Sequence, residues 1–472
     1  MGDYAAVTDP SDWRAPLLVG ATPLDVPLMA RNPAGWPGYL ARQAVTAWVL
    51  DPAVLPGGPV AARWDFASFG GSFGEDDATV LVLAAAEATR RRVPLVTLVR
   101  TGGTRLQEGM AALMGIPRAR LALLELAAAG LPHLSVADAP TTGGVWISVT
   151  SAADLRVAVE GATVGFAGPR VVEAVTGVRP AHGSHTASSA YAAGLVDAVL
   201  PAADVPAWLW EALTALTSGP SDLGAVLGEP RSAAPTGRSG WDQVRRARTR
   251  TTGGAALLGS LLVGPVALQA PHGDRTVAAA VGRLGGERGR AVVAVALAAH
   301  VGVRPSPDGY RLAARAYRLA GRLGLPALSL VDTPGAEPGA AAEDDGIAPA
   351  MGEALDALLS CPSPTVALVH GEGGSGGALA AATADLLLLT DDAYFAAIGP
   401  EGASAALRLA PERCADLMRI TPADLVALGA ADAVLAHPAE VVAHLVRLSD
   451  SSGADRLVRR RARWSSHLPG QL

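Results

Sequence analysis

Short apolar runs alternate with amphipathic stretches along most of the chain, and this alternation predicts an α/β fold. Val60–Phe66 has the pattern of a strand, Asp76–Arg92 repeats its apolar positions at helical spacing, and Pro94–Val99 is a continuous apolar run typical of a buried strand. The second half repeats this order, with a helix predicted over Asp308–Leu323 and a buried strand over Pro326–Val331.

The two halves share landmarks at a nearly constant offset. Four pairs show it: Pro94 with Pro326, Gly103 with Gly335, Gly143 with Gly376, and Pro169 with Pro400. Landmarks so closely in register predict two copies of one domain. Residues 1–60 are rich in Pro, Trp and Gly, and Ser218–Gly240 is rich in Gly, Pro and Ser. We therefore expect an N-terminal arm at 1–60, domains at 61–217 and 251–472, and a linker at 218–250.

The most informative stretch is Thr365–Ala384, where an apolar strand-like run meets a cluster of glycines that opens a helix pattern. Glycines at such a turn allow bare backbone N–H groups to face a ligand, and the start of a helix favours negative charge. Three interpretations compete. Gly371, Gly373 and Gly376 fit a dinucleotide-binding G-x-G-x-x-G, with Asp391 as far downstream as the acidic residue of that motif should be. Ser375 fits a G-x-S-x-G nucleophile elbow, with Asp391 and His437 following in hydrolase order. The third is an oxyanion hole without a side-chain nucleophile.

The repeat favours the third interpretation. Both halves share a Gly-Gly pair at this loop, Gly143-Gly144 and Gly376-Gly377, whereas Thr142 occupies the place of Ser375 in our alignment. A second glycine loop precedes this pair at nearly the same spacing in each half, at Gly103 and at Gly335. Two such loops per half predict two oxyanion holes, which suits a reaction with two enolate-like oxygens.

Composition narrows the chemistry further. The 38 Lys and Arg residues are all arginine, so this chain offers no Schiff-base lysine and no attachment point for biotin. The net charge is −6 and no long basic run occurs, which disfavours nucleic-acid binding; Arg459-Arg460-Arg461 predicts a charged C-terminal tail. Cys361 and Cys414 are too few for a disulfide framework or a zinc site, and no stretch predicts a signal peptide or a membrane span. We expect a cytoplasmic protein without a metal.

The motifs resemble those of bacterial acetyl-CoA carboxylase carboxyltransferase. The first half is similar to the β subunit through Asp65–Gly74, Gly102–Met110, Asp138–Val145 and Gly165–Val171. The second half is similar to the α subunit through Pro307–Arg311, Asp332–Gly339, Gly371–Ala380 and Gly399–Gly402. The matches follow family order from about residue 60 to 440, so the chain resembles a β–α fusion.

The resemblance implies tandem duplicated crotonase-like (ClpP/crotonase) β-β-α superhelix domains in a homodimer or larger homo-oligomer. It implies transfer of CO2 from carboxybiotin to the α-carbon of an acyl thioester, with biotin carboxylase and a separate biotin carboxyl carrier protein as partners. By position, one oxyanion hole for the thioester and another for the ureido oxygen of biotin would come from Gly143, Gly144, Gly376 and Gly377, helped by Gly103, Gly335 and Ala336. Residues beside these loops are candidates for contacts with the CoA thioester or biotin: Gly102, Thr104, Arg105, Thr142, Arg170, Pro334, Gly374 and Ser375.

Some assignments stay open at this point. Arg105 fits a CoA phosphate or acceptor carboxylate as well as a structural ion pair with Glu108, and His370 is expected to be a hydrogen-bonded core histidine. The zinc ribbon of the β subunit is absent and basic residues are fewer than the family pattern has, so the acyl group and its carrier, CoA or protein, are undetermined. The alternatives are a biotin-independent malonyl-thioester decarboxylase and, more distantly, a serine hydrolase that uses Ser375.

Overall fold

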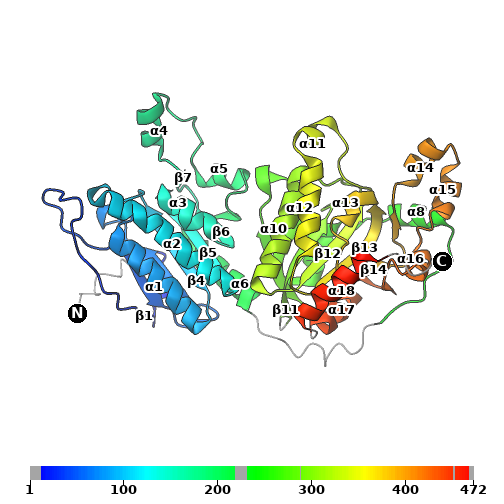
Figure 1. The fold of residues 1–472 in the computed structure, drawn as a ribbon, viewed down its shortest axis with the longest axis horizontal. Coiled ribbons are helices and arrows are strands. Elements are labelled where there is room, and N and C mark those ends of the chain that lie inside the picture. The colour runs from blue at the N-terminus through cyan, green and yellow to red at the C-terminus, as the bar shows by residue number, and fades with distance from the viewer. Residues whose placement is uncertain (1–11, 218–230, 288, 450–451, 467–472) are drawn as a thin grey trace. The chain divides into compact units, whose positions relative to one another are not determined.

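The computed structural model describes residues 12–217, 231–287, 289–449 and 452–466, and these fall into two compact units that divide between Thr217 and Ser218 (Figure 1). Among the described residues, no helix combines the length and the apolar character that a bilayer-spanning helix needs.

The first unit is an eight-stranded sheet with helices packed against it. The strands run in the order β1-β2-β3-β4-β5-β6-β8, with β7 paired to β5, and pairing is parallel from β3 onward. Their bounds are β1 Thr22–Pro23, β2 Val45–Val49, β3 Val60–Trp64, β4 Leu95–Thr101, β5 His133–Thr142, β6 Leu155–Val159, β7 Val164–Gly165 and β8 Ala198–Leu200. The helices are α1 Glu75–Arg91, α2 Met110–Ala128, α3 Gly144–Ser148, α4 Pro169–Thr176, α5 Ala187–Ala192 and α6 Val205–Thr217.

The second unit repeats this plan. Its sheet has the order β16-β14-β13-β12-β11-β10-β9, with β15 paired to β13. The strands are β9 Leu262–Leu268, β10 Val277–Leu284, β11 Arg290–Leu297, β12 Ala327–Thr333, β13 Thr365–Gly374, β14 Leu386–Thr390, β15 Tyr394–Ala396 and β16 Ala433–Leu435. The helices are α8 Gly240–Arg248, α9 Gly254–Leu261, α10 Pro307–Leu323, α11 Ala340–Asp344, α12 Ile347–Leu359, α13 Ser375–Leu379, α14 Pro400–Leu407, α15 Pro411–Leu417, α16 Pro422–Ala427, α17 Val441–Ser449 and α18 Gly453–Ser465.

The predicted repeat is confirmed down to strand register. Thr101 pairs with Thr141 after a shift in the β4–β5 ladder, and Thr333 pairs with Gly373 after the same shift between β12 and β13. A helix begins directly after each long strand, and a short strand, β7 or β15, pairs with the end of that strand. Two glycine loops per unit are therefore placed at the carboxyl ends of adjacent parallel strands, where ligands of α/β sheets bind.

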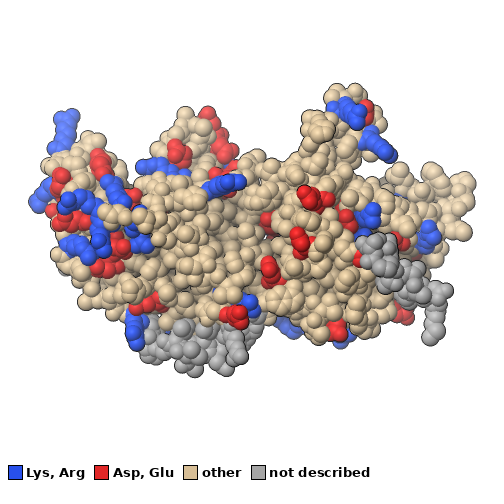
Figure 2. All heavy atoms as spheres, turned by 180° about the vertical axis from the view of Figure 1, so that it is seen from behind, with Lys and Arg blue, Asp and Glu red and all other residues tan. Residues whose placement is uncertain are grey.

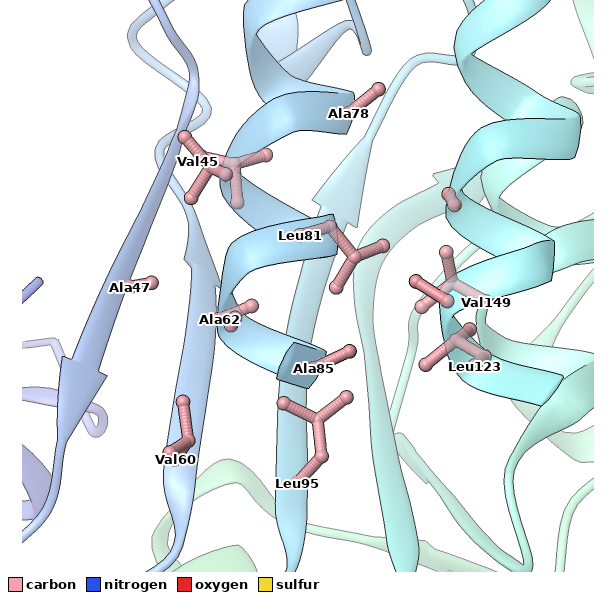
Figure 3. Packing of buried hydrophobic residues seen from close by; sticks show 14 of the residues in the cluster. Val45, Ala47, Val60, Ala62, Ala78, Leu81, Ala85, Leu95, Leu123 and Val149 are labelled. Atoms are coloured by element: carbon pink, nitrogen blue, oxygen red, sulfur yellow. The ribbon is translucent and has the colours of Figure 1, made fainter. Parts of the chain in front are cut away.

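Small side chains account for the close contact between helix and sheet in the first unit. Ala78, Leu81 and Ala85 on α1 are buried in one cluster with Val60 on β3 and Leu95 on β4 (Figure 3). Alanines on the inner face of a helix let its backbone lie close to the sheet, and every buried methyl group contributes about 0.8 kcal/mol. The Ala-rich composition is thus used for close packing.

The structure shows secondary structure in two segments that the sequence suggested to be an arm and a linker. The expected arm at 1–60 contains β1 and β2, which extend the first sheet, because β2 is largely buried and pairs with both β1 and β3. The expected linker at 218–250 contains α8, which packs on β13, β15 and α15 of the second unit. Residues 218–230 of that linker lie outside the described residues.

The charged side chains do not gather by sign on the face that Figure 2 shows. Arginine and acidic side chains are interspersed there, and uncharged residues cover most of the surface. That face therefore presents no broad basic area of the kind that nucleic-acid-binding proteins use.

Candidate active site

The early glycine loop of each unit is held by a threonine hydroxyl. Thr101 Oγ1 accepts the N–H of Gly103 at 3.0 Å and donates to the carbonyl of Gly103 at 3.3 Å. Thr333 Oγ1 does the same for Gly335, at 3.2 Å and 2.9 Å. Sequence analysis did not identify these threonines, although the spacing between them is the one that separates Gly103 from Gly335.

This geometry also changes the role of the two glycines. The N–H groups of Gly103 and Gly335 are occupied by the threonine hydroxyls, so they are not available to a ligand oxygen. The next residues, Thr104 and Ala336, follow in the same loops. Both glycines have φ in the left-handed half of the map, at +118° and +132°, which favours glycine at this bend.

The late glycine loops align one residue differently from our prediction. Gly143 and Ser375 both have positive φ, +72° and +59°, and each directly follows the last residue of its long strand. Gly143, and not Thr142, is therefore the counterpart of Ser375, and Gly144 corresponds to Gly376. The sequence alignment matched Gly143 to Gly376 because glycine identity outweighed the single-residue difference in spacing.

The two loops of each unit touch through their backbones. A Cβ placed on Gly143 would lie 2.9 Å from Gly103 Cα, and one placed on Gly377 would lie 2.3 Å from the backbone nitrogen of Ala336. A Cβ on Gly374 would lie 2.2 Å from the carbonyl of Pro334. Such distances exclude any side chain, so these glycines are needed for the approach of one loop to the other.

Several backbone N–H groups in these loops have no acceptor. Gly143 N–H donates to the carbonyls of Gly165 and Phe166, at 3.3 Å and 3.0 Å. Within the described part of the chain, the N–H groups of Thr104 and Gly144 in the first unit, and of Ala336 and Gly376 in the second, have no hydrogen-bond acceptor. Gly144 and Gly376 lie in the first turn of α3 and α13, where N–H groups lack an intrahelical partner. In each unit an unpaired N–H group thus lies on each of two loops in contact, which is the donor arrangement of an oxyanion hole.

Tyr310 fixes the second unit's loop from behind. Its hydroxyl donates to the carbonyl of Gly377 at 3.0 Å, and the side chain is fully buried on α10. Burial raises the pKa of this phenol, with a further rise from nearby Tyr317, so it stays a neutral donor. Tyr310 was not among the predicted site residues.

The two candidate arginines have different surroundings. Arg105 is completely buried and pairs with Asp77 at 2.6 Å and Glu108 at 3.1 Å, so the ion-pair interpretation is the one the geometry favours and a contact with substrate is not available to it. Arg170 is exposed at the start of α4 and forms no ion pair among the described residues. It remains a candidate for an anionic group of the substrate.

The remaining predicted contact residues are mostly part of the framework. Gly102 N–H donates to the carbonyl of Gly70 at 2.9 Å, and the hydroxyl of buried Thr142 donates to the carbonyl of Thr101 at 3.4 Å. Within the described ranges, no group of three or more His, Cys, Asp and Glu side chains is placed to hold a metal ion.

The contacts of Asp391 argue against the dinucleotide-binding motif and the nucleophile elbow. Its carboxylate accepts the N–H of Thr236 at 2.9 Å and pairs with Arg238 at 3.0 Å. These contacts take the place of the ribose or the catalytic histidine that the two motifs would require as its partner. His437 is exposed. The positive φ of Ser375 would suit a nucleophile elbow, but the same backbone geometry occurs at Gly143, where no nucleophile exists.

His370 is a core residue, but the expected hydrogen bond is absent. It is fully buried on β13, and neither ring nitrogen has a partner among the described residues. Burial and, to a smaller extent, the positive charge of Arg250 lower the pKa of His370 from 6.5 to about 3, against an opposing effect of Asp392. The ring is therefore neutral at physiological pH.

Substitution of His370 by leucine should make the stability of the protein less sensitive to mild acid. Between pH 6.5 and 3 the unfolded chain takes up a proton that folded His370 does not, so this contribution to stability is present above pH 6.5 and is lost as the pH falls, by up to about 1.4 kcal/mol per pH unit. The free energy of unfolding, measured with urea between pH 7.5 and 5, should fall less steeply in His370→Leu than in the wild type. Equal slopes would show that His370 does not retain a low pKa.

Comparison with known proteins identifies the family. Residues 60–192 match the carboxyl transferase domain model, and residues 274–458 match the model of acetyl co-enzyme A carboxylase carboxyltransferase-like domains. The acetyl-coenzyme A carboxylase carboxyl transferase subunits beta/alpha of Salinispora arenicola is 38% identical over 462 residues, spanning 89% of this chain and 81% of the relative. The chain belongs to the acyl-CoA carboxylase carboxyltransferase family. It is the carboxyltransferase subunit of a biotin-dependent acyl-CoA carboxylase.

A second relative and a solved structure are also similar to this carboxyltransferase. The probable biotin-dependent acyl-coenzyme A carboxylase beta3 subunit of Mycobacterium bovis is 33% identical over 407 residues, covering 84% of this chain and 81% of the relative. The hexameric core of transcarboxylase 12S, solved with hydrolysed methylmalonyl-coenzyme A, has the same fold, with a TM-score of 0.71 at 22% identity over 86% of this chain and 80% of that one. The predicted tandem crotonase-like fold is confirmed.

Proposed function

We propose that this carboxyltransferase moves CO2 from carboxybiotin to the α-carbon of an acyl-CoA thioester, and that its catalytic groups are backbone N–H donors. The observation that carries the proposal is the pair of unpaired N–H groups on touching loops in each unit: Thr104 with Gly144, and Ala336 with Gly376. This refines the predicted set of Gly143, Gly144, Gly376 and Gly377 by the one-residue shift in register.

The proposed roles follow from charge. Removal of the α-proton of an acyl thioester places negative charge on the thioester oxygen, and one pair of N–H groups stabilises it. The other pair binds the ureido oxygen of biotin. A donor of this kind lowers the barrier by about 3 kcal/mol, because it is aimed at the developing charge and needs no reorganisation.

The chain's neutral loops fit biotin's ureido group, which offers an oxygen acceptor and needs no cation. Carboxybiotin supplies the CO2, and its ureido nitrogen can take the α-proton, so the loops need only bind, orient and exclude water. These 472 residues contain no lysine that could carry biotin, so we infer that biotin is attached to a separate carrier protein, loaded by biotin carboxylase. Arg170 is our candidate contact for an anionic group of CoA.

A transfer assay with malonyl-CoA and methylmalonyl-CoA, each with and without free biotin, tests this proposal. We expect loss of CO2 from at least one thioester that depends on biotin and yields the decarboxylated acyl-CoA. Loss of CO2 at the same rate without biotin would support the decarboxylase alternative instead. No reaction with either thioester, with biotin present, would contradict the proposal.

We infer that the active form is a homo-oligomer. Exposed apolar residues lie around the loops of both units. Ile147 and Leu379 stand at equivalent positions, and Val175 and Leu407 lie near the C-terminal ends of α4 and α14, with 37% to 79% of each residue exposed. The outer face of α2 adds a stripe at helical spacing: Met110, Leu113, Met114, Leu121 and Leu124. Contiguous apolar surface of this kind usually lies in an interface. Light scattering that gives the mass of a monomer at working concentration would contradict this inference.

A cytoplasmic location is our further proposal. Cys361 and Cys414 are both free thiols and both buried, as expected for a protein from a reducing compartment. Cell fractionation with a tagged chain tests it, and recovery from the membrane pellet or the medium would contradict it.

Variants at Ser375 separate carboxyl transfer from serine hydrolysis. Ser375→Gly reproduces the residue found at the equivalent position in the first unit and suits the positive φ, so kcat for transfer should stay within about threefold of the wild type. A hydrolase that loses its nucleophile would lose about 10⁴-fold or more. Steady-state kinetics of Ser375→Gly and Ser375→Ala decides between them, and a collapse of both would restore the hydrolase hypothesis.

A further inference from the structure

A single guanidinium joins the second unit's late glycine loop to helix α14. Arg248, the last residue of α8, donates through Nε to Glu372 Oε2 at 2.9 Å and through its two terminal nitrogens to Glu401, at 2.5 Å and 3.2 Å. Glu372 lies on β13 two residues before Gly374, and Glu401 is the second residue of α14. The bidentate contact orients Glu401, and the single contact through Nε holds Glu372 to the same planar group.

Glu372, one of the partners of Arg248, also contacts strand β15. Glu372 is only 9% exposed and also accepts the hydroxyl of Tyr394 at 2.7 Å. Tyr394 opens β15, which pairs with the glycine segment of β13, and a Cβ on Gly373 would lie 2.8 Å from the Tyr394 carbonyl. A change at Arg248 therefore acts on the strand that flanks the loop as well as on α14.

Helix α8, which carries Arg248, has further contacts nearer its start. Gln243 is fully buried and donates to the carbonyls of Asp391 at 2.8 Å and Ala393 at 2.7 Å. Gly240 N–H donates to Asp416 on α15 at 2.7 Å. Figure 1 shows α8, α14 and α15 grouped at one end of the second unit.

Residues 12–217 of the first unit show no such connection. Pro140 stands at the position equivalent to Glu372, and Arg170 stands at the position equivalent to Glu401. Helix α4 has no buried residue, whereas α14 buries Pro400 and Ala403. The two otherwise matched loops thus differ in how firmly the following helix is held.

We propose that Arg248 is a positioning residue for carboxyl transfer: it holds α14 and β15 against β13, so that the N–H groups of the second oxyanion hole keep their direction. The inference rests on the proposed function of that loop. Loss of the guanidinium leaves Glu372 largely buried with Tyr394 as its remaining partner and places it near Glu401 without a shared cation, which drives the two segments apart. A small displacement of donors is costly in rate because their value depends on direction.

The test compares Arg248→Met with Arg245→Met in the full chain, assayed with carrier and acyl-CoA. Arg245 lies on the same helix but forms an exposed pair with Asp242. We expect Arg248→Met to lower kcat by about 10- to 100-fold while KM for the thioester changes less than threefold, because the donors are misdirected but the binding surface persists. Arg245→Met should match the wild type. A kcat for Arg248→Met within twofold of the wild type would overturn the inference.

Two further variants keep the result interpretable. Arg248→Lys should recover part of kcat because one charge is restored without the fork. Glu401→Gln removes only one contact and should cost less than Arg248→Met, and the double variant should be no worse than Arg248→Met alone; additive losses would overturn the shared role.

Hydrogen exchange separates this inference from the proposed function. Peptides covering 371–379 and 399–407 should exchange faster in Arg248→Met than in Arg245→Met, whatever the activity of the preparation. Unchanged exchange would overturn the connection itself. A wild type that fails to transfer CO2 would instead overturn the proposed function.

Discussion

Replacing Gly377 with alanine should lower kcat by about 100- to 1,000-fold, the loss expected when one oxyanion donor is removed. The new Cβ would lie 2.3 Å from the backbone nitrogen of Ala336 and 2.9 Å from the carbonyl carbon of Gly335, so the two loops have to separate. Ala336 N–H is one of the proposed donors, and its direction changes with that separation. The measurement is single-turnover transfer from carboxybiotin to an acyl-CoA.

Gly352→Ala is the matched control for this result. Gly352 lies inside α12, and a Cβ there meets nothing within 4 Å. Alanine in a helix interior is more favourable than glycine by about 0.5–1 kcal/mol, so this variant should keep full activity and unfold no earlier. If Gly377→Ala retained more than a third of the wild-type kcat, the second glycine loop would not be an oxyanion hole.

Replacing Arg460 with alanine should reduce the free energy of unfolding by about 3–5 kcal/mol, because it leaves a buried carboxylate without its partner. The guanidinium is 1% exposed and contacts both oxygens of Asp385, at 2.8 Å and 2.6 Å. It also donates to four carbonyls, those of Leu358, Leu359, Cys361 and Ser363. Helix α18 is thereby joined to the end of α12 and to the segments that begin β13 and β14.

Arg461→Ala provides the comparison, since the neighbouring arginine is exposed on the same helix. Urea unfolding followed by circular dichroism should show an early transition for Arg460→Ala and a curve close to the wild type for Arg461→Ala. Indistinguishable curves for the two variants would mean that the buried network contributes no stability.

The fate of this arginine illustrates what sequence reasoning could not provide. Arg459-Arg460-Arg461 was expected to be a charged tail, yet its middle member is one of the most buried side chains of the second unit. A run of three arginines does not show which of the three side chains faces the core. Likewise, the sequence left open whether Arg105 binds substrate or forms an ion pair. In the structure it is enclosed by Asp77 and Glu108.

The sequence by itself determined the repeat, the two glycine loops per half, the family and the absence of lysine in this chain. These properties depend on spacing and residue type, and a glycine cluster after an apolar run restricts the backbone wherever the chain folds. The same spacing placed equivalent loops at equivalent strand ends, which the two sheets confirm.

Only the tertiary structure decided which atoms of those loops are free. Gly103 and Gly335 lose their N–H groups to Thr101 and Thr333, and Gly143 proves equivalent to Ser375 through its backbone angle. The hydrogen bond from Arg248 to Glu372 joins residues that are 124 positions apart in the sequence. The hydrogen-bond partners of a residue and its burial depend on the groups that the fold brings next to it. For these residues, those groups are distant in sequence.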